Sequence, residues 1–273
     1  MPIMKGKPKA FNKDGVYREL ILEPLRKCAD YTPKFGQGEE GLAPDDFITM
    51  YGADPLYAWI GFDSPLMYAA HKAAGGMTSL YRQLGIGCER LFRQLIKDQL
   101  ALTAEQANWS YEQVDGSGLV RTLYLDGRIL LSDVTSPQAA ERVQQWLEAM
   151  KKKLGIATPI SGAVFEVRQG YKSKDSKRQN ADLHNAAQAI SQGYIPVLTI
   201  MSSQLDMDIK LRYEVGKWGV LAGLPGLEDE TASTFAFAQK VLAYDLRGFF
   251  ERNRKILRKE VVAILSALLK PND

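Results

Sequence analysis

An acidic residue inside an apolar run is the feature of this chain that most strongly suggests chemistry. Residues 162–168 read GAVFEVR, and Glu166 interrupts a stretch that is typical of a buried strand. Arg168 follows two positions later, and alternate residues of a strand face the same side. A carboxylate is costly inside an apolar strand unless it has a partner, and a metal ion is one such partner.

A basic, hydroxyl-rich segment follows this strand directly. Its cations and hydroxyls are Lys172, Ser173, Lys174, Ser176, Lys177 and Arg178. Such a segment suits the phosphate groups of a nucleic acid. The acid, the cation and the phosphate-binding surface together indicate metal-dependent cleavage of nucleic acid.

This chemistry requires a second acid near Glu166. Phosphodiester hydrolysis needs an activated water and charge neutralisation, which one or two Mg²⁺ ions supply, and Mg²⁺ prefers a few carboxylates and several waters. Asp133 is favoured because it follows the apolar run 129–131, at the end of a predicted strand. Asp126 belongs to an Asp-Gly pair, which is typical of a hairpin turn. As an alternative, Asp133 is the N-terminal acid of the next helix.

Apolar periodicity predicts the elements that would position these residues. Helices are predicted over about 15–30, 78–102, 137–154 and 175–192, with one or two more in 233–269. Strands are predicted over 162–168 and 194–201, and an antiparallel meander of three strands over 109–134. Residues 31–65 suggest short helices and ordered loops, and 203–232 suggest loops that could read bases.

The order of these elements indicates an α/β (α+β) fold, with a mixed central sheet flanked by helices. We expect an N-terminal lobe of helices and loops over 1–75. The core, with the C-terminal helices, is expected over 76–273, and the two parts are expected to form one continuous domain.

Composition restricts the class of protein only weakly. The chain has 273 residues and a net charge of +3, which does not by itself establish a nucleic-acid partner. Two distant cysteines, Cys28 and Cys88, form no disulfide framework and fit a reducing cytoplasm. The N-terminus lacks the apolar segment of a signal peptide, and no apolar stretch is long enough to span a bilayer. We therefore expect a cytoplasmic protein without a membrane partner.

The motifs resemble the PD-(D/E)xK nuclease superfamily. Asp133 matches its first acid, Glu166 matches the acid of the triplet, and Arg168 stands where the family usually has lysine. The continuation KSKDSKRQNADLHNAAQAISQGYIPVLTIMS is similar to type II restriction endonucleases, in particular the ApaLI-like group. Glu89, in GIGCERLFRQL, resembles an acid that many of these enzymes carry on the preceding helix. The resemblance covers about residues 80–202.

The resemblance implies a restriction-endonuclease-like core and a site-specific endonuclease that cuts double-stranded DNA as a homodimer. Mg²⁺ would bind Asp133 and Glu166, and Glu89 through water, and the cut would leave a 3′ hydroxyl and a 5′ phosphate. Arg168 or Lys172 would steady the charge of the attacked phosphate. The DNA backbone would be held by Lys174, Ser176, Lys177 and Arg178.

Two departures from the family and three alternatives remain open. Arginine at 168 stays protonated and cannot act as a base, so Lys172 is the alternative cation. The gap between Asp133 and Glu166 is long, which makes the helix at 137–154 an insertion. Glu166 could instead be a buried structural acid paired with Arg168 or Arg178. The function could be that of a repair or junction nuclease, or of a non-catalytic DNA-binding protein on a nuclease scaffold.

Overall fold

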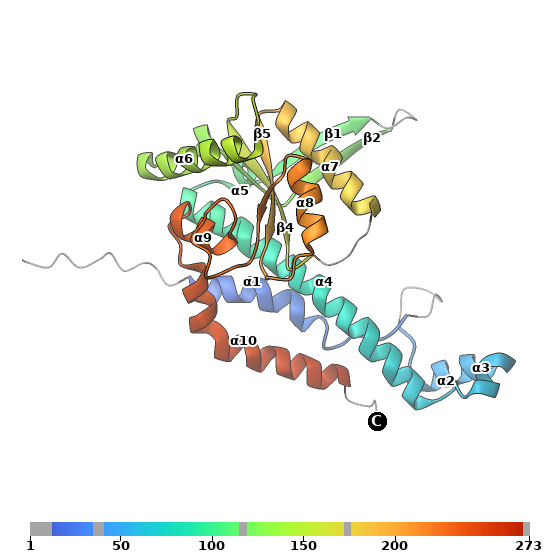
Figure 1. Ribbon diagram of the computed structural model, residues 1–273. Helices are drawn as coiled ribbons and strands as arrows, with labels where there is room; N and C mark the ends of the chain where they lie inside the picture. The colour runs from blue at the N-terminus through green and yellow to red at the C-terminus, as the bar shows by residue number, and fades with distance from the viewer. Residues whose placement is uncertain (1–12, 35–40, 115–118, 172–175, 270–273) are drawn as a thin grey trace, which may run out of the picture. The chain divides into compact units, whose positions relative to one another are not determined.

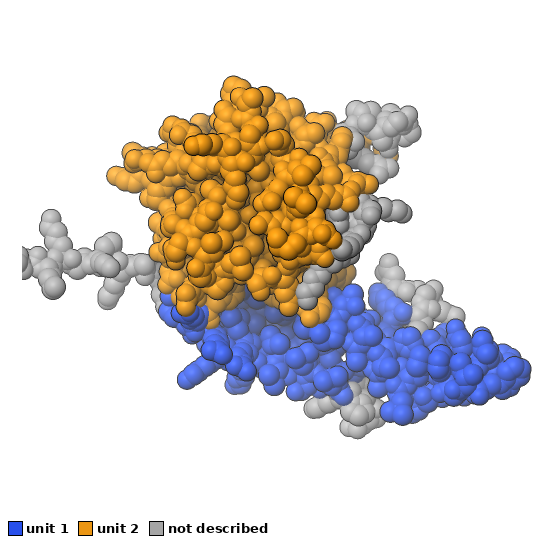
Figure 2. All heavy atoms as spheres, in the orientation of Figure 1, with its two compact units in different colours: residues 1–80, 251–273 blue, residues 81–250 orange. Residues whose placement is uncertain are grey.

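The chain separates into two compact units. The computed structural model describes residues 13–34, 41–114, 119–171 and 176–269. Unit 1 comprises residues 1–80 and 251–273, and unit 2 comprises residues 81–250 (Figure 2). The expected division placed all of 76–273 in the core, whereas the structure assigns residues from 251 onward to the unit that contains the N-terminus. None of the helices in the described ranges combines the length and the apolar character that a membrane span needs.

Unit 1 is helical. Its helices are α1 (Asp14–Arg26), α2 (Pro44–Gly52), α3 (Pro55–Ile60), the first part of α4 (Pro65–Leu100) and most of α10 (Leu246–Leu269). Ion pairs join α1 to α10: Arg252 Nε lies 2.9 Å from Asp14 Oδ2, and Arg26 Nε lies 3.0 Å from Glu260 Oε2. The helix that was predicted at 78–102 belongs to α4, which is longer, and the residues of α4 are divided between the two units.

Unit 2 contains a mixed sheet and the remaining helices (Figure 1). Its strands are β1 (Trp109–Val114), β2 (Val120–Leu125), β3 (Gly127–Leu130), β4 (Gly162–Arg168), β5 (Tyr194–Ile200) and β6 (Gly219–Leu221). Its helices besides α4 and the start of α10 are α5 (Ala104–Ala107), the 3₁₀ turn η1 (Leu131–Asp133), α6 (Pro137–Leu154), α7 (Ser176–Ser191), α8 (Met207–Val215) and α9 (Thr234–Lys240). The expected mixture of helices around a mixed sheet is confirmed.

The central sheet has the order β3-β4-β5-β6. β3 is antiparallel to β4, whereas β4, β5 and β6 run parallel. β4 and β5 are buried along nearly their whole length, which explains why both read as continuous apolar runs. Glu166 is the only residue of β4 that is not fully buried.

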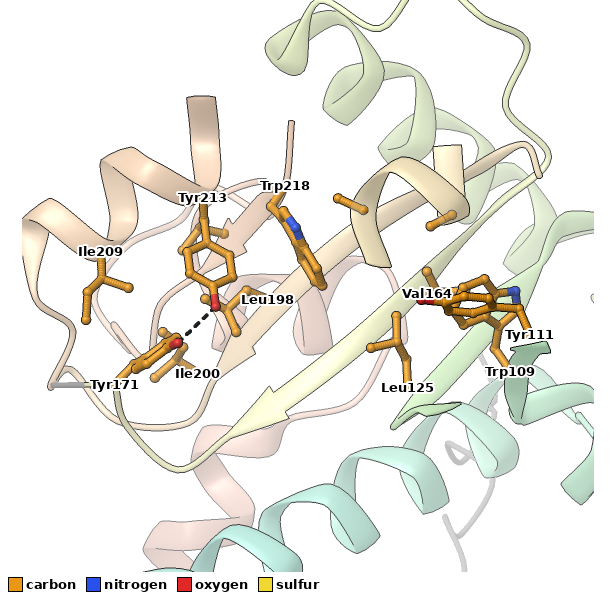
Figure 3. Close-up of a cluster of buried hydrophobic side chains, with 13 residues drawn as sticks. Trp109, Tyr111, Leu125, Val164, Tyr171, Leu198, Ile200, Ile209, Tyr213 and Trp218 are labelled. Atoms are coloured by element: carbon orange, nitrogen blue, oxygen red, sulfur yellow. Dashed lines mark hydrogen bonds between the residues drawn. The ribbon is translucent and has the colours of Figure 1, made fainter. Parts of the chain in front are cut away.

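Helices cover both faces of β4. On one face the ring of Phe165 packs against Phe92 of α4, Trp146 of α6 and Phe237 of α9, with ring centroids 5.0, 6.0 and 5.7 Å away. On the other face Val164 joins an apolar cluster that α7, α8 and the β1–β2 pair complete (Figure 3). Residues with even numbers on β4 therefore face α7 and α8, because side chains alternate along a strand.

The expected meander of three strands is wrong. β1 and β2 form an antiparallel pair of their own, and β3 belongs to the central sheet. The β1–β2 pair packs its inner face, with Trp109, Tyr111 and Leu125, into the cluster beside α7. Tyr111 also donates a hydrogen bond from its hydroxyl to Asn185 Oδ1 of α7, at 2.5 Å.

Candidate functional site

The candidate site is built on the second half of β4. Glu166 and Arg168 lie on the strand face that α7 covers, and Arg168 Nη2 is 3.1 Å from Glu166 Oε1. The same nitrogen is 2.5 Å from Asp182 Oδ2 of α7. The acid inside the apolar run therefore has the cationic partner that strand alternation predicted.

Asp126 directly precedes the neighbouring strand β3 and lies opposite Glu166 of β4. β3 pairs with β4 so that Gly127 faces Phe165, and the residue before Gly127 therefore faces Glu166. The amide of Asp126 donates to the carbonyl of Phe165 at 2.7 Å, and Asp126 Oδ2 accepts a hydrogen bond from the amide of Val167 at 2.8 Å. These two bonds hold Asp126 against β4, at the backbone position opposite Glu166.

Asp133, the acid that was expected to complete the site, lies at the opposite end of β3. It belongs to η1 and follows Leu130, which faces Gly162 at the start of β4. Because the strands are antiparallel, the end of β3 meets the beginning of β4 and not the part that carries Glu166. Asp133 Oδ2 instead accepts a hydrogen bond from Arg128 Nη2 at 3.3 Å. The structure does not bring Asp133 and Glu166 together, so the expected pairing is wrong.

The Asp126-Gly127 pair is not the tip of a hairpin. β2 ends before it and β3 begins with it, and the two strands belong to different sheets. A Cβ atom at position 127 would lie only 3.1 Å from Ile96 Cδ1 and 3.7 Å from Phe92 Cε1, both on α4. Glycine therefore permits the close approach of β3 to α4, and the preceding aspartate is held against β4.

Helix α4 contributes a second cation to the site. Arg93 Nε donates to the carbonyl of Asp126 at 2.7 Å, and Arg93 Nη2 lies 3.9 Å from Asp126 Oδ1. Glu89 is one turn earlier on the same face of α4 and is half-buried. Sequence reasoning noted Glu89 but missed Arg93, although their spacing of four residues placed both on one face.

Burial and the neighbouring Glu89 raise the pKa of Cys88 to about 12, so this thiol stays protonated at neutral pH.

Arg168 is held in a buried polar network. Tyr213 of α8 donates a hydrogen bond from its hydroxyl to Asp182 Oδ2. The hydroxyls of Tyr171 and Tyr213 are 3.0 Å apart (Figure 3), and the guanidinium of Arg168 lies over the Tyr171 ring, 4.4 Å from its centroid. Burial opposes the charge of Arg168, but Glu166 and Asp182 outweigh it and raise the pKa of the guanidinium. Burial, and then the bonds to Asp182 and Tyr171, raise the pKa of Tyr213.

This network favours an orienting role for Arg168. Its side chain is 6% exposed, and one of its nitrogens already bridges two carboxylates. A guanidinium in this setting fixes Glu166 more readily than it reaches an incoming phosphate. Asp182 was missed at the level of sequence, although it falls at helical spacing with the buried Ala186 and Ala189 of α7.

The basic segment after β4 lies largely outside the residues that the structure describes. Lys172 and Lys174 are outside the described residues. Ser176, Lys177 and Arg178 form the first turn of α7, and the positions of their side chains are outside the description. The expected phosphate contacts of these five residues therefore remain predictions.

The acids present fit a magnesium ion only with help from water and substrate. In the described ranges, no group of three or more histidine, cysteine, aspartate or glutamate side chains is placed to hold a metal ion. Mg²⁺ is commonly held by one or two carboxylates, with waters and substrate phosphate oxygens as its other ligands. Asp126 and Glu166 occupy opposite positions of the β3–β4 pair and are partly exposed, so they offer that number of carboxylates.

Comparisons with protein-family models, with curated proteins and with solved structures found no match to this chain. The functional argument therefore depends on the geometry of Asp126, Glu166 and their partners.

Proposed function

We propose that this chain is a Mg²⁺-dependent endonuclease that hydrolyses double-stranded DNA, of the PD-(D/E)xK type and the ApaLI-like branch of type II restriction endonucleases. One observation carries the proposal: the register of β3 and β4 places Asp126 opposite Glu166. Arg168 follows Glu166 by two residues on the same strand. Two acids at paired positions can hold Mg²⁺ together with waters and phosphate oxygens, and the cation beside one of them fits the acid-x-cation triplet.

The order of elements supports a restriction-endonuclease-like core. α4 precedes the strands, β3 and β4 are antiparallel, and β4 is joined through α7 to the parallel strand β5. An acid at a strand end, an acid-x-cation triplet on the following strand and a helix after it are the pattern that the resemblance implies. The acid at the strand end is Asp126, and α6 lies between the two acids as an insertion.

Each side chain of the site has a distinct role in this proposal. Asp126 and Glu166 would hold Mg²⁺, which when bound activates water and neutralises phosphate charge. The Val167 amide fixes the carboxylate of Asp126, and Arg168 orients that of Glu166. Arg93 and the basic segment 172–178 supply positive charge for the DNA backbone. A palindromic target would be cut by a symmetric homodimer, with each subunit cutting one strand.

Digestion of plasmid DNA tests the proposal. Wild-type protein with Mg²⁺ should give discrete fragments with one common end sequence, and EDTA should abolish the reaction. Glu166→Gln should bind DNA but not cut it, because the charge that holds the metal is lost while contacts to phosphate remain. Absence of Mg²⁺-dependent cleavage by folded, DNA-binding wild-type protein would contradict the assignment as an enzyme.

A non-catalytic DNA-binding protein is the second candidate. The observation that favours it is the contact of Glu166 with Arg168, because an ion pair competes with a metal for the carboxylate. The two candidates differ in one measurement, since a binding protein would retain plasmid DNA in a gel shift and leave its strands intact with Mg²⁺. A repair or junction nuclease would cut branched DNA and give no discrete plasmid fragments.

A further inference from the structure

A pocket of about 610 Å³ is lined by Arg93, the arginine of α4 that donates to the carbonyl of Asp126. Its walls come from α4, from α5 and the start of β1 with the residue between them, and from β2 and β3. The lining residues that matter most are Arg93, Glu105, Asn108, Trp109, Tyr124 and Arg128. A volume of this size is in the range of pockets that hold small organic molecules.

Two anchored arginines give the pocket an affinity for phosphate. Arg93 is held by the carbonyl of Asp126, and Arg128 Nε donates to the carbonyl of Gln106 at 2.9 Å while its Nη2 contacts Asp133. Both guanidinium groups are fixed on one edge and still partly exposed. Arginines held in this way bind phosphate oxygens in a fork geometry with little further loss of side-chain freedom.

Other side chains of the pocket suit a nucleobase. Tyr124 is on the outer face of β2 and 70% exposed, although a tyrosine normally buries its ring. An exposed aromatic face stacks on any base. Glu105 is exposed, and hydrogen bonds from its own amide and from Thr103 lower the pKa of its carboxyl group. It therefore accepts hydrogen bonds at neutral pH, as the amino groups of bases require. Asn108 adds an amide that can donate or accept.

We propose that this pocket binds one nucleotide, with its phosphate at Arg93 and Arg128 and its base on Tyr124. Arg93 also contacts Asp126, so a nucleotide in the pocket would adjoin the acids of the candidate site. Only the source of the nucleotide rests on the proposed function: it is a nucleotide of the DNA strand being cut, or a free nucleotide. The chemistry of recognition is the same in both cases.

Binding of deoxynucleoside 5′-monophosphates tests the pocket without any cleavage. Calorimetry should give a dissociation constant of about 1 mM or tighter for wild-type protein in metal-free buffer. Deoxynucleosides without phosphate should bind at least tenfold more weakly. Tyr124→Ala should weaken nucleotide binding about fivefold or more, and Tyr124→Phe should keep it, because stacking needs only the ring. Tyr81→Ala is the control, since Tyr81 is an exposed tyrosine of α4 outside the pocket.

The outcomes separate this inference from the proposed function. Loss of affinity in Tyr124→Ala alone supports the pocket, even if no DNA is ever cut. If a monophosphate also inhibits plasmid cleavage by wild type but not by Tyr124→Ala, the pocket holds a nucleotide of the substrate strand; binding without inhibition assigns it to free nucleotides. Equal affinity in wild type and Tyr124→Ala, equal binding of nucleosides and nucleotides, or no binding at 10-fold above the expected constant would overturn the inference.

Discussion

The two ends of β3 carry similar ion pairs, but only one end lies opposite the second acid of the candidate site. Asp126 precedes the strand and Asp133 follows it, their side chains are 19% and 18% exposed, and each contacts an arginine. Only Asp126 lies beside Glu166, because β3 runs antiparallel to β4. Local surroundings therefore do not distinguish the two aspartates, and strand pairing does.

Removal of the Glu166 charge has the largest expected effect on activity. Glu166→Gln should reduce single-turnover cleavage about a thousandfold or more, since several kcal/mol of metal-assisted stabilisation of the transition state are lost. DNA binding in Ca²⁺ should change little, and circular dichroism should show a folded protein. A single-turnover rate within tenfold of wild type would show that Glu166 is not a metal ligand. The position of Asp126 opposite Glu166 would then no longer favour Asp126 over Asp133.

Loss of the buried arginine should have the largest effect on stability. Arg168→Met leaves Glu166 and Asp182 without their shared cation, which should lower the free energy of unfolding by about 3–5 kcal/mol. The matched change at the less deeply buried Arg128, Arg128→Met, should cost about 1 kcal/mol or less from its ion pair.

Urea denaturation of both arginine variants measures this difference. The double variant Arg168→Met/Asp182→Leu should recover part of the loss, because the uncompensated charge of Asp182 is removed. Equal costs at positions 168 and 128 would show that the deeper burial of Arg168 adds nothing to the cost of its loss.

The hydroxyl of Tyr213 should contribute a smaller amount. Tyr213→Phe removes a hydrogen bond to the carboxylate of Asp182, which is expected to cost about 1.5–3 kcal/mol. Tyr111→Phe removes a bond to the neutral side chain of Asn185 and should cost about 1 kcal/mol. Thermal unfolding of the two variants under one condition checks the order, and a larger loss in Tyr111→Phe would argue against a strong bond from Tyr213 to Asp182.

Helices and strands whose apolar residues recur at regular spacing were predictable from the sequence. The ranges 137–154 and 162–168 were predicted with the bounds that α6 and β4 have. α6 carries its own signals: Ser136 accepts a hydrogen bond from the amide of Ala139, and Gly155 ends the helix with positive φ. β4 was visible because burial on both faces makes it apolar apart from Glu166 and Arg168.

Features that depend on long-range pairing were not predictable. The choice between Asp126 and Asp133 required the direction of β3 relative to β4, which lies in no local pattern. α8 was missed because apolar and polar residues alternate along MDIKLRYEV, residues 207–215, so the sequence shows no apolar stripe at helical spacing. In the structure Ile209 and Tyr213 are buried, whereas Met207, Leu211 and Val215 are exposed. The roles of Arg93 and Asp182 likewise arise from contacts between elements distant in sequence.

Cleavage by Asp126→Asn and Asp133→Asn, measured side by side, tests the central claim most directly. Asparagine keeps the size of each side chain and removes the charge that a metal requires. The account predicts that Asp126→Asn loses about a hundredfold or more in single-turnover plasmid cleavage at saturating Mg²⁺, while Asp133→Asn stays within about threefold of wild type. Loss of cleavage in Asp133→Asn with activity retained in Asp126→Asn would contradict the assignment of Asp126 to the site.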